Sequence, residues 1–277
     1  MRAQRAHEVI TDDRVAIRAT VEGEGPPVVF LQGVMGDGDL DWAAVVPHVA
    51  GRFTCHLPSM RGRGRSGDHP NLRIDRIGAD YETYVESLGE PAGLVGWSAG
   101  AGHALAVASR SAAVRATAAY EPMAGMLMDD EERAALLGAL VRGGELVAQG
   151  DLPGGMRAIA EHPFTAEDLE SADAAGYFEA TGGYSPHVLR VFQQVAEYEG
   201  AMPEDPAVLG AIDTPVLVLH GSETSPFFAA SARHVAGHVR DSRLHAIPGA
   251  GHIGPLTHPR AVGAELVDFF GAAFAAA

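Results

Sequence analysis

The pattern of apolar and polar positions changes twice along this chain of 277 residues. Before residue 123, short apolar runs of strand type alternate with segments of helical spacing, and the same alternation returns after residue 210. Residues 123–210 show only helical spacing, with acidic residues between the apolar ones. Strands that alternate with helices predict an α/β fold with a mostly parallel sheet and right-handed crossovers.

The individual elements can be predicted from the same pattern. Two alternating segments, 7–10 and 15–21, indicate an antiparallel hairpin at the start. The remaining strands are short and apolar, and are predicted at 27–31, 53–57, 92–97, 113–120, 216–219 and 243–247. Helices are predicted between them and after the last strand, at 42–50, 73–88, 227–239 and 259–275.

The helical block interrupts the alternating pattern between two late strands. Open parallel sheets bind ligands at the carboxyl ends of their strands, so we expect the block to lie over that edge. The sequence is therefore interpreted as a core domain, 1–122 and 211–277, that carries a helical cap, 123–210.

Composition and charge narrow the class of protein. The net charge of −16 disfavours nucleic acid and anionic membrane surfaces as partners, and it says little about a small neutral substrate. Its one cysteine, Cys55, cannot form an internal disulfide, and the N-terminal residues lack the apolar stretch of a secretory signal. We therefore expect a cytoplasmic protein, whose oligomeric state the sequence does not define.

One pentapeptide carries the strongest chemical signal. Gly96-Trp97-Ser98-Ala99-Gly100 reads G-x-S-x-G and lies between a predicted strand and a run of small residues with helical character. A serine on a sharp strand-to-helix turn is a nucleophile elbow, where side chains at the two glycine positions would collide with neighbouring backbone. Ser98 is therefore the candidate nucleophile.

A serine hydroxyl needs a base, and the base needs an acid that orients it. His252 is the candidate base, because it follows the last predicted strand on the small-residue loop Pro248-Gly249-Ala250-Gly251. His234 and His238 lie four residues apart on a predicted helix without a third ligand nearby, so no metal is expected.

These motifs together resemble the α/β-hydrolase superfamily over nearly the whole chain. The order Ser98…acid…His252 is the order of that family, and the loop Gln32-Gly33-Val34-Met35-Gly36 is similar to its oxyanion loop, with Gln32 where histidine is common. The run 61–66, R-G-R-G-R-S, and the ending G-A-G-H also match the family. The resemblance implies an oxyanion hole made by the backbone N–H groups of Val34 and Ala99, and no cofactor.

The acid departs from the usual pattern of the family. The position after the next-to-last strand that usually holds aspartate is Thr224, and Glu223 precedes it. Glu121 is the alternative, because it ends the preceding strand, where members that resemble haloalkane dehalogenases carry their acid. Both glutamates stay open, with Glu121 preferred since a carboxylate at the end of a buried strand needs a partner.

The prediction from sequence is a serine hydrolase that cleaves an ester, lactone or thioester of a small apolar molecule through an acyl-serine intermediate. Trp97, Met35 and Met123 are candidate pocket residues. A cofactor-free perhydrolase or a carbon–carbon bond hydrolase would use the same residues. A ligand-binding protein on a hydrolase scaffold is the alternative from another class.

Overall fold

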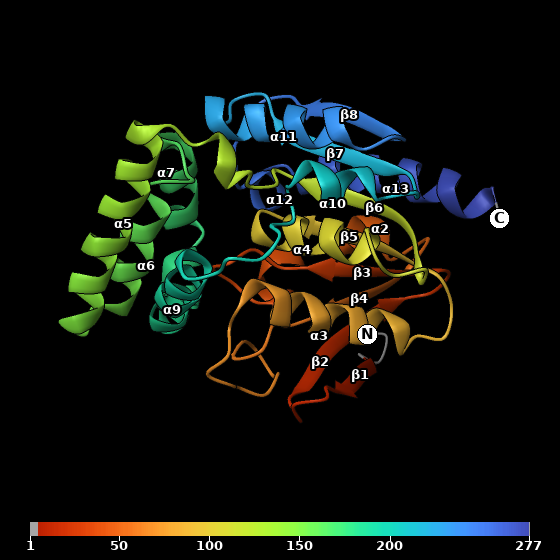
Figure 1. Ribbon diagram of the computed structural model, residues 1–277, viewed down its shortest axis with the longest axis horizontal. Helices are drawn as coiled ribbons and strands as arrows, with labels where there is room; N and C mark the ends of the chain where they lie inside the picture. The colour runs from red at the N-terminus through yellow and green to blue at the C-terminus, as the bar shows by residue number, and fades with distance from the viewer. Residues whose placement is uncertain (1–4, 277) are drawn as a thin grey trace.

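A twisted sheet of eight strands runs through the computed structural model, which describes residues 5–276 (Figure 1). The predicted core domain and the predicted lack of a secretory signal also involve residues 1–4 and 277, which lie outside the described residues. The strands, in chain order, are β1 (Arg5–Ile10), β2 (Ala16–Gly23), β3 (Pro27–Leu31), β4 (Thr54–Pro58), β5 (Ala92–Trp97), β6 (Val114–Tyr120), β7 (Val216–Gly221) and β8 (Ser242–Ile247).

The order of strands in the sheet is β1-β2-β4-β3-β5-β6-β7-β8. The pairs β1/β2 and β2/β4 are antiparallel, and all later neighbours pair in parallel. The predicted hairpin and the predicted α/β class are therefore confirmed. Because β5, β6 and β7 are adjacent and parallel, their carboxyl ends lie side by side at one edge.

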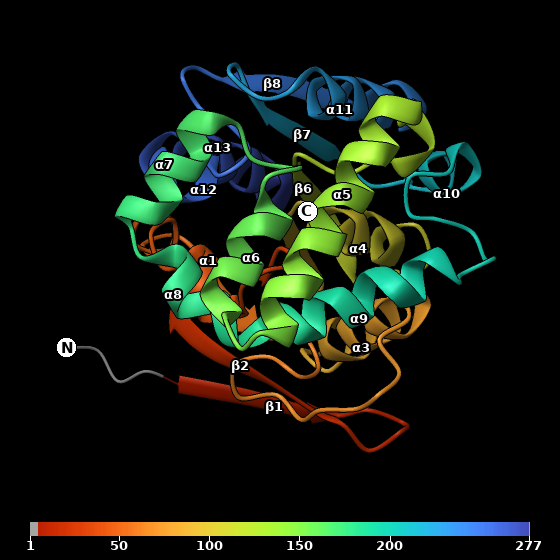
Figure 2. The ribbon, with the colours of Figure 1, turned by 90° about the vertical axis from the view of Figure 1, so that its left-hand side faces the viewer.

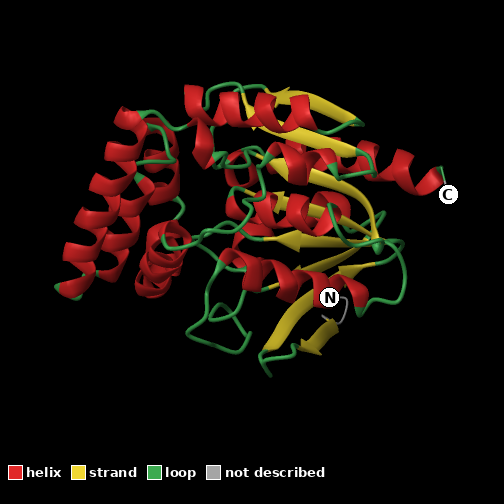
Figure 3. Cartoon of the chain, viewed as in Figure 1, coloured by secondary structure: helices red, strands yellow, loops and turns green. Residues whose placement is uncertain are grey.

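Helices cover both faces of the sheet (Figure 3). One face packs against α1 (Gly38–Trp42), α2 (Val46–Val49) and α13 (Pro259–Ala275), and the other against α3 (Ile74–Glu86), α4 (Ala99–Ala108) and α11 (Pro226–His238). α12 (Gly254–Thr257) precedes α13. The β5 strand is buried on both faces, which explains its continuous apolar run.

The single helix predicted for 42–50 is wrong in detail. The chain forms α1 and then α2, with a turn between them. Pro47 lies in the first turn of α2, where its missing N–H costs nothing. In the interior of one longer helix, the same proline would remove a hydrogen bond and collide with the preceding turn.

Residues 123–210, all of them described, contain helices but no strand. They form η1 (Gly125–Leu127), α5 (Asp130–Ala148), α6 (Leu152–Ala160), α7 (Ala166–Ala174), α8 (Tyr177–Thr181), η2 (Gly182–Tyr184), α9 (Ser185–Ala196) and α10 (Pro206–Gly210). Helices α5, α6, α7 and α9 stand beyond one end of the sheet, as both views show (Figures 1 and 2). We call residues 123–210 the helical segment; its status as a separate cap domain stays a prediction.

Candidate active site

Ser98 lies at the turn between β5 and α4. Its backbone has φ 56° and ψ −118°, a conformation that costs energy for a residue with a side chain. A Cβ atom on Gly96 would lie 2.1 Å from the Gly100 carbonyl oxygen, and one on Gly100 would lie 2.3 Å from the Gln32 carbonyl oxygen. Both glycines of the pentapeptide are therefore required by close backbone contacts.

His252 is fixed by contacts around its ring. Its Nδ1 atom is 2.7 Å from Oε2 of Glu121, and its ring stacks on Phe228 of α11 with centroids 4.0 Å apart. The side chains of His252 and Glu121 are 3% and 0% exposed. With Nδ1 held by the carboxylate, Nε2 is the ring nitrogen left for chemistry.

Glu121, not Glu223, lies against His252. Besides the histidine, its carboxylate accepts hydrogen bonds from the Gly221 N–H at 2.7 Å and from the Thr224 hydroxyl at 2.8 Å. Its backbone has φ 46°, a left-handed conformation that lets the chain leave β6 as the side chain turns toward β7. The carboxylate of Glu223 is exposed and accepts a hydrogen bond from the Ser222 hydroxyl.

The backbone of His252 is held from two sides. Its N–H donates to Oδ2 of Asp168 at 3.0 Å, and its carbonyl accepts the indole N–H of Trp97 at 2.8 Å. Asp168 lies in α7, where it also completes a capping box with Thr165. Sequence analysis missed Asp168, because the T-x-x-D spacing indicates only a helix start.

The glycine-rich loop after β3 is held by side chains. Gln32 donates to the Gly36 carbonyl at 2.5 Å and accepts the Met60 N–H at 2.8 Å, so it braces the loop in place of the usual histidine. Asp41 of α1 accepts the Gly33 N–H at 2.8 Å and the Tyr177 hydroxyl at 3.0 Å. Burial raises the pKa of Asp41 to about 7.

Arg63 ties the same loop to the helical segment. Its guanidinium donates to the carbonyls of Val34 at 2.9 Å and Met35 at 3.1 Å, and its Nε to Nδ1 of His187 in α9 at 3.1 Å. Burial lowers the pKa of Arg63 to about 10. Sequence analysis identified the R-G-R-G-R-S run only as a match to the family, so its contact with the glycine-rich loop was not predicted.

The two candidate oxyanion donors come from different parts of the chain: Val34 lies in the loop after β3, and Ala99 directly follows Ser98. Val34 and Ala99 both line a cavity that Ser98 also lines. Ala99 is the first residue of α4, so its N–H has no acceptor one turn earlier in the helix. An N–H group at a helix start favours developing negative charge.

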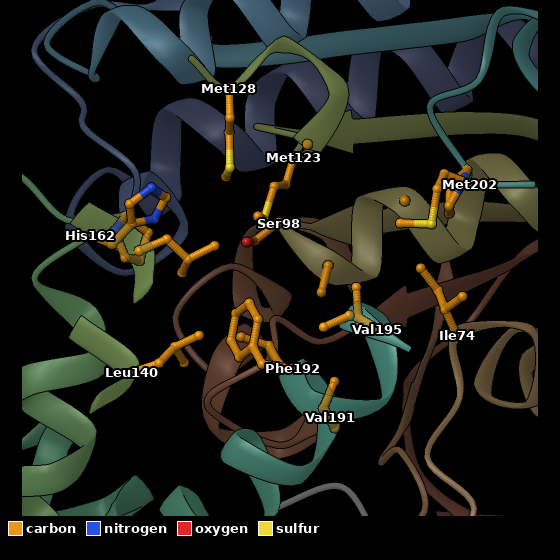
Figure 4. A pocket seen from close by; sticks show the side chains of 18 of the residues that line it. Ile74, Ser98, Met123, Met128, Leu140, His162, Val191, Phe192, Val195 and Met202 are labelled. Carbon is orange, nitrogen blue, oxygen red and sulfur yellow. The ribbon is translucent and has the colours of Figure 1, made fainter. Parts of the chain in front are cut away.

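Ser98 faces two cavities. The larger is about 410 Å³ and includes Met123 in its wall; Figure 4 shows Ser98 among the side chains that surround it. The smaller is about 20 Å³ and includes His252 and Trp97, while Val34 and Met35 border both. The structure thus brings every predicted pocket residue to a cavity that Ser98 lines.

Among residues 5–276, no three histidine, cysteine, aspartate or glutamate side chains gather closely enough to hold a metal ion. His234 and His238 are engaged with backbone carbonyls of Glu204 and His234. In the same range, no helix is long and apolar enough to cross a membrane.

An eight-stranded sheet of this order, with a serine at a strained turn after a central strand, is the architecture of a hydrolase of α/β type. A profile of the alpha/beta hydrolase fold matches residues 26–259. The chain belongs to this family.

Solved structures agree with this assignment of the fold. An alpha/beta hydrolase from Sphaerobacter thermophilus is 24% identical, with a TM-score of 0.75 over 95% of this chain and 100% of that one. An esterase from Rhodococcus is 21% identical, with a TM-score of 0.76 over 96% and 98%. The enol-lactonase from Burkholderia xenovorans is 18% identical, with a TM-score of 0.71 over 96% and 100%.

One characterised relative matches in sequence over a shorter stretch. Pyrrolizixenacetamide deacetylase from Xenorhabdus hominickii is 29% identical over 91 residues, which is 32% of this chain and 34% of that protein. The match spans about a third of the relative's length.

Proposed function

We propose that this protein is a serine hydrolase that cleaves an ester, lactone or thioester through an acyl-serine intermediate. The observation that carries the proposal is the 2.7 Å contact between His252 Nδ1 and the buried Glu121, beside the cavity that His252 shares with Ser98. A buried carboxylate that holds one ring nitrogen makes the other a proton acceptor for the serine hydroxyl.

In the proposed reaction, Ser98 Oγ attacks the carbonyl carbon while Nε2 of His252 takes its proton. The N–H groups of Val34 and Ala99 stabilise the oxyanion, and one such donor is worth about 2.7–4 kcal/mol in the transition state. The bond to the leaving group breaks, and His252 protonates the departing oxygen or sulfur. A water molecule, deprotonated by the same histidine, then releases the acid and regenerates Ser98.

The substrate in this proposal is a small, apolar molecule. Its support is the composition of the larger cavity, in which methionine, leucine, isoleucine and valine side chains predominate. We also propose a cytoplasmic location without nucleic acid or membrane partners, supported by the net charge of −16 and the single buried thiol of Cys55.

The test is intact-mass spectrometry after treatment with a fluorophosphonate. The wild type should gain one phosphonyl group on Ser98 with loss of fluoride, and Ser98→Ala should gain none. Ser87→Ala is the matched control, because Ser87 is exposed on the surface, and it should be labelled like the wild type. Folded wild type that gains no adduct and hydrolyses no ester would overturn the proposal in favour of a binding protein.

A further inference from the structure

The two cavities beside Ser98 differ in size by more than an order of magnitude. The larger one, about 410 Å³, extends from Ser98 past α9 toward Ile74 and Met202 (Figure 4). The smaller one, about 20 Å³, lies next to His252. A cavity of that size holds about one water-sized group. Because Ser98, Val34 and Met35 border both spaces, a carbonyl carbon at Ser98 can place one substituent in each.

The small cavity has walls that cannot easily move apart. Trp97 is 2% exposed, and its indole N–H holds the His252 carbonyl. Tyr177 is 7% exposed and donates its hydroxyl to Asp41. Phe164 packs between His252 and Phe178, with its ring centroid 5.8 Å and 6.2 Å from theirs. Each side chain is fixed by a second partner, so the space is not expected to widen for a large group.

The large cavity is suited to hydrocarbon. Two polar side chains in its wall are engaged elsewhere: Glu204 accepts the Gly125 N–H at 2.9 Å, and Arg133 donates to the Met128 carbonyl at 2.8 Å. The buried Nδ1 atom of His103, also in this wall, has no hydrogen-bond partner among the described residues. His162 lies 3.3 Å from the Glu132 carboxylate. Met123, Met128 and Met202 add flexible side chains that adapt to different apolar shapes (Figure 4).

The position of His252 decides which substituent occupies which cavity. His252 must deliver its proton to the leaving-group oxygen, and it lines only the small cavity. We propose, on the basis of the function proposed above, that the large cavity takes the acyl chain and the small cavity the leaving group. The substrate class is then an ester of a long or bulky apolar acid with a short alcohol. The ester carbon–oxygen bond breaks as Ser98 is acylated, and the alkoxide leaves as the free alcohol with the proton from His252.

Two isomeric esters test this orientation directly. Methyl nonanoate carries its bulk on the acid and octyl acetate carries it on the alcohol, so they share one formula and differ in orientation. We expect kcat/KM to be at least about tenfold higher for methyl nonanoate, because misfit groups in rigid apolar pockets cost about 10–200-fold. Equal rates, or faster cleavage of octyl acetate, would overturn the inference.

Single substitutions test the two cavities independently. Val195→Trp, which fills the far part of the large cavity, should lower kcat/KM for methyl nonanoate relative to methyl butyrate. Val141→Trp is the control, since Val141 is 52% exposed on α5, and it should leave that ratio unchanged. Phe164→Ala should raise the relative rate of octyl acetate, because it removes one wall of the small cavity.

The fluorophosphonate result distinguishes the two proposals. If Ser98 is phosphonylated but the preference for methyl nonanoate is absent, the assignment of the cavities is wrong and the hydrolase proposal stands. If Ser98 is not labelled and neither ester is cleaved, both proposals fail together.

Discussion

The Thr224 hydroxyl donates a hydrogen bond to Oε2 of Glu121 at 2.8 Å, the same oxygen that lies 2.7 Å from His252. Thr224 occupies the position after β7 where the family usually carries its aspartate. The threonine therefore has not simply replaced the acid: it supports a carboxylate that reaches the histidine from the neighbouring strand, β6. Glu121 is thus bound at three points, by Thr224, His252 and the Gly221 N–H.

The first prediction concerns the choice of acid. Glu121→Gln should lower kcat by about 10³- to 10⁴-fold, because an amide cannot stabilise the positive charge that forms on His252. Glu223→Gln is the matched control and should keep wild-type kcat, since Glu223 is exposed. Steady-state kinetics on one ester measures both. A larger loss of kcat in the Glu223 variant would instead identify Glu223 as the acid.

The second prediction moves the acid to its usual place. In Glu121→Ala/Thr224→Asp, the new carboxylate is at position 224, whose threonine side chain in the wild type contacts the Glu121 carboxylate. We expect kcat to recover at least about tenfold over Glu121→Ala, because His252 regains a carboxylate partner. The single variant Thr224→Asp should be less active than wild type, since two adjacent buried carboxylates cannot both ionise easily. If kcat does not recover in the double variant, the backbone position from which the carboxylate comes, and not its charge alone, determines whether it can act as the acid.

Much of the fold was predictable because each strand has its own local signal. The run before Ser98 predicted β5 with its observed bounds, and the last helix was predicted at 259–275 as observed. The turn at Ser98 was also predictable, since Gly96 and Gly100 are required by short-range backbone contacts.

The supporting contacts of the site could not be predicted in the same way. Asp168 and His252 are separated by 84 positions, and Arg63 and His187 by 124. No spacing rule links residues so far apart, because these contacts depend on how the helical segment packs on the sheet. The choice between Glu121 and Glu223 was open for the same reason, since only the packing of β6 beside β7 brings Glu121 to Thr224.

The third prediction is a pH dependence of stability that comes from Asp41. Burial raises its pKa from 3.8 to about 7, so the folded protein retains a proton that the unfolded chain has lost. The stabilisation from this group is complete below about pH 4 and is lost as the pH rises through about 7. The side chain at position 41 stays neutral at every pH in an Asp41→Asn variant. The difference in free energy of unfolding, variant minus wild type, should therefore increase as the pH rises from about 4 to about 7.

Urea denaturation at a series of pH values measures this difference. Asp39→Asn is the control, because Asp39 lies on the same helix with its side chain 49% exposed, and its difference from wild type should be flat. An equally flat difference for Asp41→Asn would contradict the assigned protonation.

The fourth prediction separates a positioning role of Asp168 from its role as a helix cap. Asp168 is 4% exposed and serves both the start of α7 and the His252 N–H, whereas Asp151 is exposed and caps only α6 through the Gly154 N–H at 2.9 Å. Asp151→Ala removes the N-cap of α6, and Asp168→Ala removes the N3 member of the capping box of α7, so each should lower the free energy of unfolding by about 1 kcal/mol. Only Asp168→Ala should also lower kcat, by about 10- to 100-fold, because small displacements of a catalytic group have effects of that size.

Hydrogen exchange provides a readout that loss of a cap alone would not change. The His252 amide proton should exchange faster in Asp168→Ala than in Asp151→Ala, since only the first variant removes its acceptor.

Asp168→Asn should restore part of kcat, because one amide oxygen can accept the His252 N–H but cannot carry the charge that strengthens the bond. If both alanine variants lose stability equally and keep wild-type kcat and exchange at His252, Asp168 is only a helix cap. The position of His252 then depends on its other contacts, which include Trp97, Phe164, Phe228 and Glu121.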